Sequence, residues 1–490
     1  MRYVKKLLLL FLMVFFFVSA CDNNSQKTST ISSTTISSST TSKTTTISNT
    51  TSKNNTSTTE KKTTTKPNIP ITTDQVDKNL YVSNVTEPSD GTLDNPTTLI
   101  DALNRAKNDQ IVYILAGTYS FSEGILLNKT NANKQIIEAY NGEVIFDFNN
   151  SQDDYGILIS GTNYLVKGIT VTGVGVGHDV SWSNATTYLY GGIIVCGNDN
   201  IVEQCISHHN IGSGISITRY DTSNSTYSKW PMNNLILNST SYKNGDNSHY
   251  ASNGFEVKAV NEGNALDGCI AYGNLNNGFE VTNSESLLTI GVVELRNCIA
   301  YKNGIDINDK YFSKSPGNGF LVGGKGNATN HKMINCLSTF NRGHGFNDGS
   351  NNGNILFESC TSYMNSGYSS GDKSNFNSQS RGLHTYLNCL SYSGGLTMSD
   401  KYYGSASYSY MFNSSKYYYI STSIDVNSST SSMRGTEVAT YNANEIFIST
   451  EIDLSLVYRN EDGTIRTNGF LEVKDDFAYY GNGKKLGAIF

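Results

Sequence analysis

A motif built around cysteine recurs along the middle of this 490-residue chain and constrains its fold more than any other feature. Each copy has a polar or small residue, a Cys, an apolar residue, a small residue and usually an aromatic, with an Asn five positions after the Cys. The copies are centred on Cys205, Cys269, Cys298, Cys336, Cys360 and Cys389, with Ser239 in the same place in a further copy; the Cys389 copy lacks the final Asn. Because successive copies are 24 to 38 residues apart, we expect one structural unit per step, with insertions confined to loops.

A second string, with Gly at its centre, is interleaved with the first. It reads Ser-Gly-Ile at 213–215, Asn-Gly-Phe at 253–255, 277–279 and 318–320, and His-Gly-Phe at 344–346. Each unit therefore has at least two short strands, with Gly at the bend. Such short units cannot bury their own faces, so neighbouring units must stack about 4.8 Å apart. The sequence predicts an all-β fold, a right-handed parallel β-helix, and disfavours a leucine-rich repeat.

The repeated cysteines allow two interpretations. In a secreted protein they can indicate disulfides or a metal site. One Cys per unit, at the same place in each strand, fits an inward stack of small apolar thiols better. The Asn that follows is expected to form a similar internal ladder, each amide bonding to its neighbours above and below. We therefore assign both sets to the core and not to a functional site.

The N-terminus has the pattern of an export signal. Arg2, Lys5 and Lys6 precede an apolar run at 7–18, which meets Val-Ser-Ala-Cys at 18–21. The run is too short for a confident membrane span. The string resembles the bacterial lipoprotein box, so residues 1–21 are predicted to be a lipoprotein signal with a lipidated Cys21; the alternative is an ordinary signal peptide with an incidental Cys. The first interpretation places the protein on the bacterial cell surface, attached to the membrane only through lipid.

Residues 22–73 are almost all Ser, Thr, Asn and Lys. Such a segment cannot bury enough apolar area to fold, so we expect a disordered stalk with an average end-to-end distance of about 40 Å. The alternative is an aggregation-prone or merely unstructured tail, which the adjacent lipoprotein-like Cys disfavours. The β-helix domain is predicted to be residues 74–490, extracellular and monomeric, with a β-rich C-terminal extension from about 395. The formal charge of −6 and the absence of a suggested basic face argue against nucleic acid as a partner.

Several short strings outside the repeats are distinctive. They are Leu-Tyr-Val-Ser at 80–83, Gly-Thr-Leu-Asp-Asn-Pro at 91–96, Asp-Ala-Leu at 101–103, Ala-Gly-Thr-Tyr at 116–119, Arg-Asn-Glu-Asp-Gly at 459–463 and Phe-Leu at 470–471. Together with the repeats, these strings resemble those of polysaccharide lyase family 9, the β-helical pectate lyases. The resemblance covers about residues 79 to 490. The resemblance implies an acidic polysaccharide such as pectate as the ligand and β-elimination as the reaction.

The family's site residues are substituted in this chain. Family members bind calcium through aspartates in an Asp-Gly-Phe and an Asp-Asp-Gly-Trp-Asp string, and their base is a Lys after a later Asn-Gly-Phe. The matching positions here are Asn253 in the first string, Asn276, Asn277 and Glu280 in the second, and Leu321 in place of the base. Leu321 cannot take a proton, and a positioned base is typically worth roughly 10²–10⁴-fold in rate. Lys258 and Lys325 are the nearest replacements, against the simpler interpretation that both are solvated.

Strand alternation predicts Glu256, Glu280 and Leu321 in one outward column, with the carboxylates about 5 Å apart. Their repulsion has three solutions: a Ca²⁺ completed by the amide oxygens of Asn253, Asn276 or Asn277, an ion pair with Lys258, or one protonated carboxylate.

Other side chains also have two interpretations. The adjacent His208 and His209 are expected on opposite sides of a strand. Trp182, Trp230 and the tyrosines at 402–419 are either stacking platforms for sugars or core residues.

Two functions from different classes remain open. The first is a surface lyase or hydrolase acting on acidic polysaccharide, and the second is a catalytically inactive carbohydrate-binding or adhesion lipoprotein. Fold alone does not choose between them, because β-helices support several functions.

Overall fold

The computed structural model describes residues 79–176, 189–220, 226–247, 251–282, 290–306, 308–323, 326–366, 373–379, 382–395, 397–427, 435–451, 458–480 and 483–490. All of these belong to one compact unit, residues 70–490. The predicted signal, Cys21 and the stalk lie outside the described residues, as do Lys325 and Trp182. Within the described ranges, no helix has the length and apolar character needed to cross a membrane.

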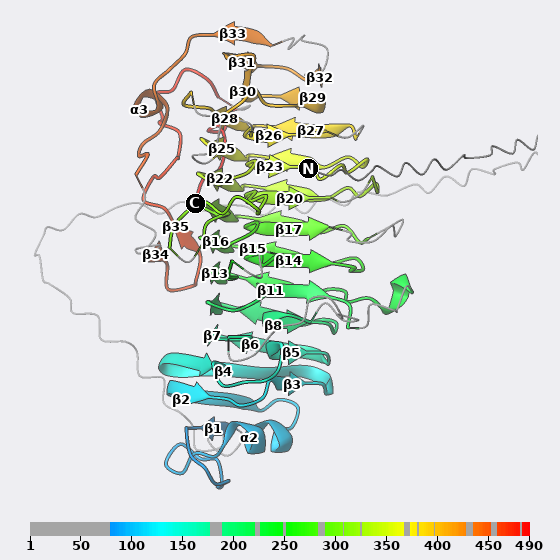
Figure 1. The fold of residues 1–490 in the computed structure, drawn as a ribbon, viewed down its shortest axis with the longest axis vertical. Coiled ribbons are helices and arrows are strands. Elements are labelled where there is room, and N and C mark those ends of the chain that lie inside the picture. Colours follow the sequence, from blue (N-terminus) through cyan, green and yellow to red (C-terminus); the bar gives the residue numbers. More distant parts are fainter. Residues whose placement is uncertain are drawn as a thin grey trace, which may run out of the picture. The chain divides into compact units, whose positions relative to one another are not determined.

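Short parallel strands stack in three rows and form a β-helix (Figure 1). The first row is β6 (Thr162–Lys167), β9 (Ile201–Glu203), β12 (Leu235–Leu237), β15 (Ala265–Asp267), β18 (Glu294–Arg296), β21 (Lys332–Ile334), β24 (Leu356–Glu358), β27 (His384–Leu387) and β29 (Tyr403–Ser407). The second is β7 (Ile169–Thr172), β10 (Ile206–His208), β13 (Thr240–Tyr242), β16 (Ile270–Tyr272), β19 (Ile299–Tyr301), β22 (Leu337–Thr339), β25 (Thr361–Tyr363), β28 (Leu390–Tyr392) and β30 (Ser409–Asn413). The parallel stack predicted from the repeats is confirmed.

The third row is a separate nine-stranded sheet that contains the Gly-Phe strings. Its strands are β3 (Ile125–Leu127), β5 (Tyr155–Ile159), β8 (Gly191–Val195), β11 (Ser213–Thr218), β14 (Phe255–Lys258), β17 (Phe279–Thr282), β20 (Phe320–Val322), β23 (Phe346–Asn347) and β26 (Phe376–Asn377). This sheet carries the residues that the sequence placed at a functional site.

The residue before each Cys makes the bend between the first and second rows. Its φ is positive, between 49° and 64°, whether it is Gln204, Asn238, Gly268 or Asn297. Only Gly and short polar residues such as Asn adopt this left-handed conformation routinely. The turn therefore favours a polar or small residue at this place of the motif.

Inside the tube, each class of repeated side chain forms its own column. The six motif cysteines are unpaired and fully buried, and burial raises the pKa of thiols such as Cys298 and Cys336 well above the ordinary value. The phenylalanines of the nine-stranded sheet stack with centroids 4.7–5.1 Å apart. The predicted inward thiol stack is confirmed in place of disulfides.

The asparagines also form the predicted ladder. The Asn274 backbone N–H and side-chain Nδ2 both donate to Asn303 Oδ1, at 3.2 and 3.0 Å, and Asn303 Nδ2 donates to Asn341 Oδ1 at 2.9 Å. The same pattern links Asn210, Asn244, Asn274, Asn303, Asn341, Asn365 and Asn375. Because these amides are buried, each hydrogen bond satisfies a group that water cannot reach.

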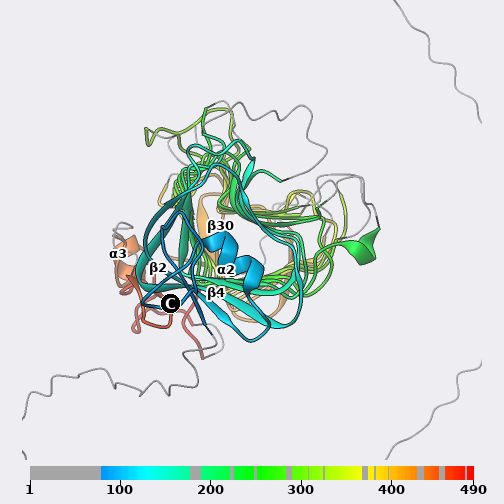
Figure 2. The same ribbon diagram turned by 90° about the horizontal axis from the view of Figure 1, so that it is seen from below.

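Different elements cover the two ends of the stack. At the N-terminal end, β1 (Leu80–Val82), β2 (Ile111–Ser120) and β4 (Thr130–Asp147) lead into the rows, and α2 (Leu99–Arg105) lies across the opening (Figure 2). At the other end, β31 (Lys416–Ile420), β32 (Ile424–Asn427) and β33 (Thr436–Val438) pair antiparallel.

The C-terminal segment, with α3 (Ala443–Ile446), β34 (Tyr458–Arg459) and β35 (Ile465–Arg466), runs back along the tube. It is held there in part by Arg459, which donates to the backbone oxygens of Gly268 and Ser239 at 2.9 and 3.1 Å.

Candidate functional site

The outer face of the nine-stranded sheet presents one continuous column of side chains. Phe255, Phe279 and Phe320 point into the core, so the residue after each of them faces outward. The register brings those residues together in the order Ser216, Glu256, Glu280, Leu321, Asn347 and Asn377. The structure therefore places Glu256, Glu280 and Leu321 in one outward column, as strand alternation predicts.

Lys258 lies between the two carboxylates of this column. It follows Glu256 by two residues on β14, so both side chains are on the same face. Lys258 Nζ is 2.7 Å from Glu256 Oε1 and 3.6 Å from Glu280 Oε1. We call Glu256, Lys258 and Glu280 the carboxylate–lysine cluster. Of the three solutions that the sequence allowed for the carboxylate pair, the structure forms the ion pair with Lys258.

Neighbouring polar groups hold the cluster in place. Ser213 Oγ and Asn253 Nδ2 donate to Glu256 Oε2 at 2.8 and 2.7 Å. Asn277 Nδ2 donates to Glu280 Oε2 at 2.9 Å, and Thr282 Oγ1 donates to Glu280 Oε1 at 3.1 Å. Each carboxylate oxygen therefore has at least one polar partner.

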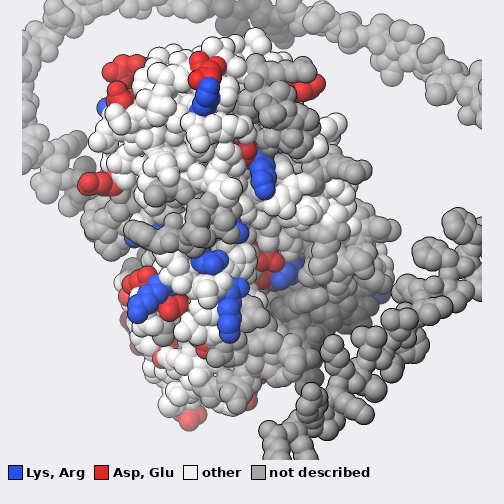
Figure 3. All heavy atoms as spheres, turned by 45° about the horizontal axis from the view of Figure 1, so that its top comes forward, with Lys and Arg blue, Asp and Glu red and all other residues white. Residues whose placement is uncertain are grey.

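Burial and ion pairing act in opposite directions on Glu256. Burial of its carboxyl group favours the neutral form and raises the pKa. The Lys258 ammonium and the hydrogen bonds from Ser213 and Asn253 more than offset this, and the pKa of Glu256 is lowered from its ordinary value. The side chains of the cluster are only 10–16% exposed, so screening by solvent is limited. Elsewhere, on the face shown in Figure 3, acidic and basic side chains are mixed.

The residues predicted to bind calcium have their oxygen atoms engaged with other partners. Asn253 Oδ1 accepts from the Asn277 backbone N–H at 3.1 Å, and Asn277 Oδ1 accepts from the Asn318 backbone N–H at 2.9 Å. Asn276 Oδ1 accepts from Ser315 Oγ at 3.2 Å. In the part of the chain that the structure describes, no group of three or more His, Cys, Asp or Glu residues is placed to hold a metal ion.

A calcium ion needs six to eight oxygen ligands, and here an ammonium already lies between the carboxylates. The residues as arranged do not fit a calcium ion. Calcium binding by Asn253, Asn276, Asn277, Glu256 and Glu280 stays a prediction, and the arrangement of the donors argues against it.

The position of the family's base holds an alkyl side chain. Leu321 is half-buried between Glu280 and Asn347, and it approaches Gly349 of the next unit. Lys258 is paired with two carboxylates, and such a pairing stabilises the ammonium over the neutral amine that a base requires. Lys325, the other predicted replacement, lies outside the described residues.

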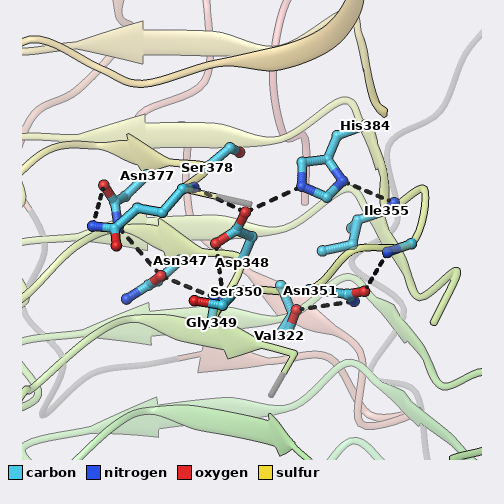
Figure 4. Close-up of polar contacts among 12 residues, drawn as sticks. Val322, Asn347, Asp348, Gly349, Ser350, Asn351, Ile355, Asn377, Ser378 and His384 are labelled. Atoms are coloured by element: carbon cyan, nitrogen blue, oxygen red, sulfur yellow. Dashed lines mark hydrogen bonds and ion pairs between the residues drawn. The ribbon is translucent and has the colours of Figure 1, made fainter. Parts of the chain in front are cut away.

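Beyond Leu321 a buried network that the sequence did not indicate supports the column (Figure 4). The Asp348 carboxylate accepts from the backbone N–H groups of Ser350 and Gln379, at 3.1 and 2.9 Å, and lies 3.3 Å from His384 Nε2. His384 Nδ1 accepts from the Ile355 backbone N–H at 3.1 Å, so its proton is on Nε2 and points to Asp348. The network fixes the turn after Asn347.

The signal for this network was present but weak. The buried His331 directly precedes β21 of the first row, and His384 is the first residue of β27 in the same row. In the earlier units the corresponding position is Asn, at 200, 234 and 264, whose side-chain oxygens accept from the same kind of backbone N–H. Alignment of the units at this position would have identified both histidines as ladder residues.

The expected orientation of the adjacent histidines was wrong. His208 Nδ1 and His209 Nδ1 are 2.8 Å apart, so the side chains meet rather than face opposite sides. The reason is that β10 ends at His208, and His209 has a φ of 52° in the following turn. Strand alternation does not apply to a residue in the left-handed region.

Among the predicted stacking aromatics that the structure describes, Trp230 and three of the tyrosines at 402–419 are core residues, and the other four tyrosines are only partly buried. Trp230, Tyr402 and Tyr417 are buried, and Trp230 packs against Tyr227. This bears out the core interpretation for these three residues.

Comparison with known proteins agrees with the fold and with the resemblance seen in the sequence. Residues 80–381 match the family described as Pel9A-like, right handed beta helix region. Pectate lyase L of Paenibacillus polymyxa is 30% identical over 401 residues, which cover 79% of each chain. Pectate lyase L of Dickeya chrysanthemi is 28% identical over 324 residues, which cover 62% of this chain and 68% of that one.

The solved structure of pectate lyase Pel9A superposes with a TM-score of 0.61 at 24% identity, over 84% of this chain and 96% of that one. At this identity it is the fold that is shared. The predicted right-handed β-helix and the resemblance to polysaccharide lyase family 9 are confirmed. This chain belongs to the Pel9A-like right-handed β-helix family of pectate lyase-like proteins.

Proposed function

We propose that this protein binds an acidic polysaccharide such as pectate along the outer face of its nine-stranded sheet, and that lysine-dependent β-elimination there is weak or absent. The observation that carries the proposal is the column itself: the carboxylate–lysine cluster lies directly beside Leu321 in register. The names of the related proteins support an acidic polysaccharide as the ligand.

The reaction chemistry explains the weak elimination. Removal of the C5 proton of a uronate needs a base, and the enolate-like transition state needs a positive group at the carboxylate. Leu321 supplies no base. The Lys258 ammonium is a hydrogen-bond donor for a carboxylate, so it suits binding more than proton abstraction.

The same column offers contacts to a sugar chain that crosses several units. Within the carboxylate–lysine cluster, the Lys258 ammonium is the positive group that a substrate carboxylate would contact. Further along the stack, Asn347, Asn377 and Gln379 form a row of carboxamides linked at 3.3 Å. Amides donate and accept hydrogen bonds, as sugar hydroxyls require.

A catalytically inactive carbohydrate-binding or adhesion lipoprotein is the second candidate. It is favoured by Leu321 and by the ion-paired state of Lys258. In both cases we propose attachment to the bacterial cell surface through lipid on Cys21, with the β-helix extracellular and monomeric. The anchor is tested with Cys21→Ser, which should abolish membrane attachment and precursor processing; unchanged attachment and processing would remove this part of the proposal.

Calorimetric titration with galacturonate oligomers in the presence of EDTA tests the binding proposal. We expect saturable binding to the wild-type protein and none to neutral galactan oligomers. Lys258→Met should lower the affinity about tenfold or more, because a charged hydrogen bond to the ligand is lost. The matched control is Lys332→Met, because Lys332 lies on another row of strands, 3.5 Å from Glu294. This variant should leave the affinity for the acidic oligomers unchanged. Absence of binding to the acidic oligomers would overturn the proposal.

A further inference from the structure

We propose that Lys258 is a built-in replacement for a divalent cation, so that the outer face of the nine-stranded sheet operates without metal and becomes a calcium site when the lysine is removed. The inference rests on the proposed function only for the identity of the polysaccharide. Its structural basis is the arrangement of charge in the carboxylate–lysine cluster.

The fold forces the two carboxylates together. Glu256 and Glu280 are direct neighbours in a parallel pair of strands, and both point outward. Two unit negative charges at strand spacing repel each other, and low exposure of both side chains keeps water from screening them fully. A positive charge at this place relieves the repulsion while both carboxylates stay ionised.

The chain itself supplies that charge from β14. Thr218 and Thr282 occupy the same position as Lys258 on the strands before and after it. Among these three equivalent positions on neighbouring strands, only Lys258 carries a charge. Its ammonium lies 2.7 Å from one carboxylate and 3.6 Å from the other. The ammonium takes the place between the carboxylates that a bridging cation would occupy.

The remaining oxygens are arranged around the lysine and not around a metal. Glu256 Oε2 accepts from Ser213 and Asn253, and Glu280 Oε2 accepts from Asn277. The donors Nδ2 of Asn253 and Asn277 present hydrogen atoms to the carboxylates, whereas a metal would require oxygen atoms there. Charge, geometry and hydrogen bonding thus agree on an internal cation.

The inference has two measurable consequences. Binding of galacturonate oligomers to the wild-type protein should be the same in EDTA and in calcium. Removal of the ammonium should leave two adjacent carboxylates without their cation, and calcium affinity should then rise.

The test is a calcium titration of the purified full chain without polysaccharide, by calorimetry and by terbium luminescence. Lys258→Met should bind calcium at least about tenfold more tightly than the wild type, since one positive charge has left the site. The gain should disappear in Lys258→Met/Glu280→Gln. Lys332→Met, which removes a lysine beside the single carboxylate Glu294, should show no gain.

Lys258→Thr guards against misfolding of the methionine variant, because Thr is the residue that both neighbouring strands carry at this position. Folded Met and Thr variants that bind calcium no better than the wild type would overturn the inference. So would wild-type binding of calcium that is lost in Glu280→Gln. A wild-type protein that binds no galacturonate oligomer in either buffer would overturn the proposed function instead, while the calcium titration would still decide the role of Lys258.

Discussion

The buried His331 should make the stability of the β-helix depend on pH. Its side chain is fully buried, and its Nδ1 accepts from the Val293 backbone N–H at 3.1 Å. Burial lowers the pKa of His331 from 6.5 to about 4. Between these values the unfolded chain binds a proton that the folded protein does not, so stability is present in full above pH 6.5 and is lost as the pH falls toward 4.

The size of the effect follows from the two pKa values. One pKa unit is worth about 1.4 kcal/mol, so the difference between the unfolded and folded pKa of His331 corresponds to roughly 3 kcal/mol of unfolding free energy. The matched variant is His331→Asn, because Asn234 and Asn264 hold the same ladder position and accept through Oδ1. Asn does not titrate in this range, so the variant should lack this part of the pH dependence.

Urea unfolding followed by circular dichroism, at several values between about pH 7 and pH 4, measures the effect. Other groups also titrate in this range, so the relevant quantity is the difference between the wild-type and variant slopes. The wild-type protein should lose roughly 3 kcal/mol more than His331→Asn over the window. Equal slopes for the two proteins would refute the assignment of a neutral, buried His331.

Three further predictions concern the ladder, the C-terminal segment and the base position. Asn303→Ala should lower the free energy of unfolding by about 2–4 kcal/mol in a denaturant titration, because buried partners such as the Asn274 N–H lose their hydrogen bonds. The exposed control Asn133→Ala should change the free energy of unfolding by less than about 0.5 kcal/mol. Equal losses in the two variants would contradict a stabilising role of the asparagine ladder. Arg459→Ala should speed limited proteolysis of the C-terminal segment, since four hydrogen bonds to the segment and the tube are lost, and an unchanged rate would show that Arg459 is not its anchor. Leu321→Lys alone should give no strong pectate elimination, because Lys258 still lies between the carboxylates. Its combination with Lys258→Thr, Asn253→Asp, Asn276→Asp, Asn277→Asp and Glu280→Asp should give a larger, non-additive gain in release of unsaturated uronate in calcium. Full activity of the single variant would contradict this prediction.

Repetition made the core predictable from sequence. A residue that recurs once per unit must occupy one column, so Cys205 and its equivalents, and Asn210 and its equivalents, could be placed inside the tube from spacing alone. The outward column of Glu256, Glu280 and Leu321 followed from the position of Phe in each strand.

Side-chain pairing within that column could not be predicted. The sequence left calcium, Lys258 and a protonated carboxylate open, because the choice depends on where a flexible side chain places its charge. The Asp348–His384 contact was missed because the two residues are 36 positions apart and come from different units. The orientation of His208 and His209 was wrong because a strand ended one residue earlier than alternation assumed.

Incubation of the wild-type protein with polygalacturonate and calcium, followed by the absorbance of unsaturated uronate, tests the central claim most directly. With Leu321 at the base position and Lys258 held between Glu256 and Glu280, we expect no product, or only slow release, at protein concentrations that saturate binding of the polysaccharide. Robust turnover by the unmodified protein would contradict the claim, and would require a base elsewhere on this face.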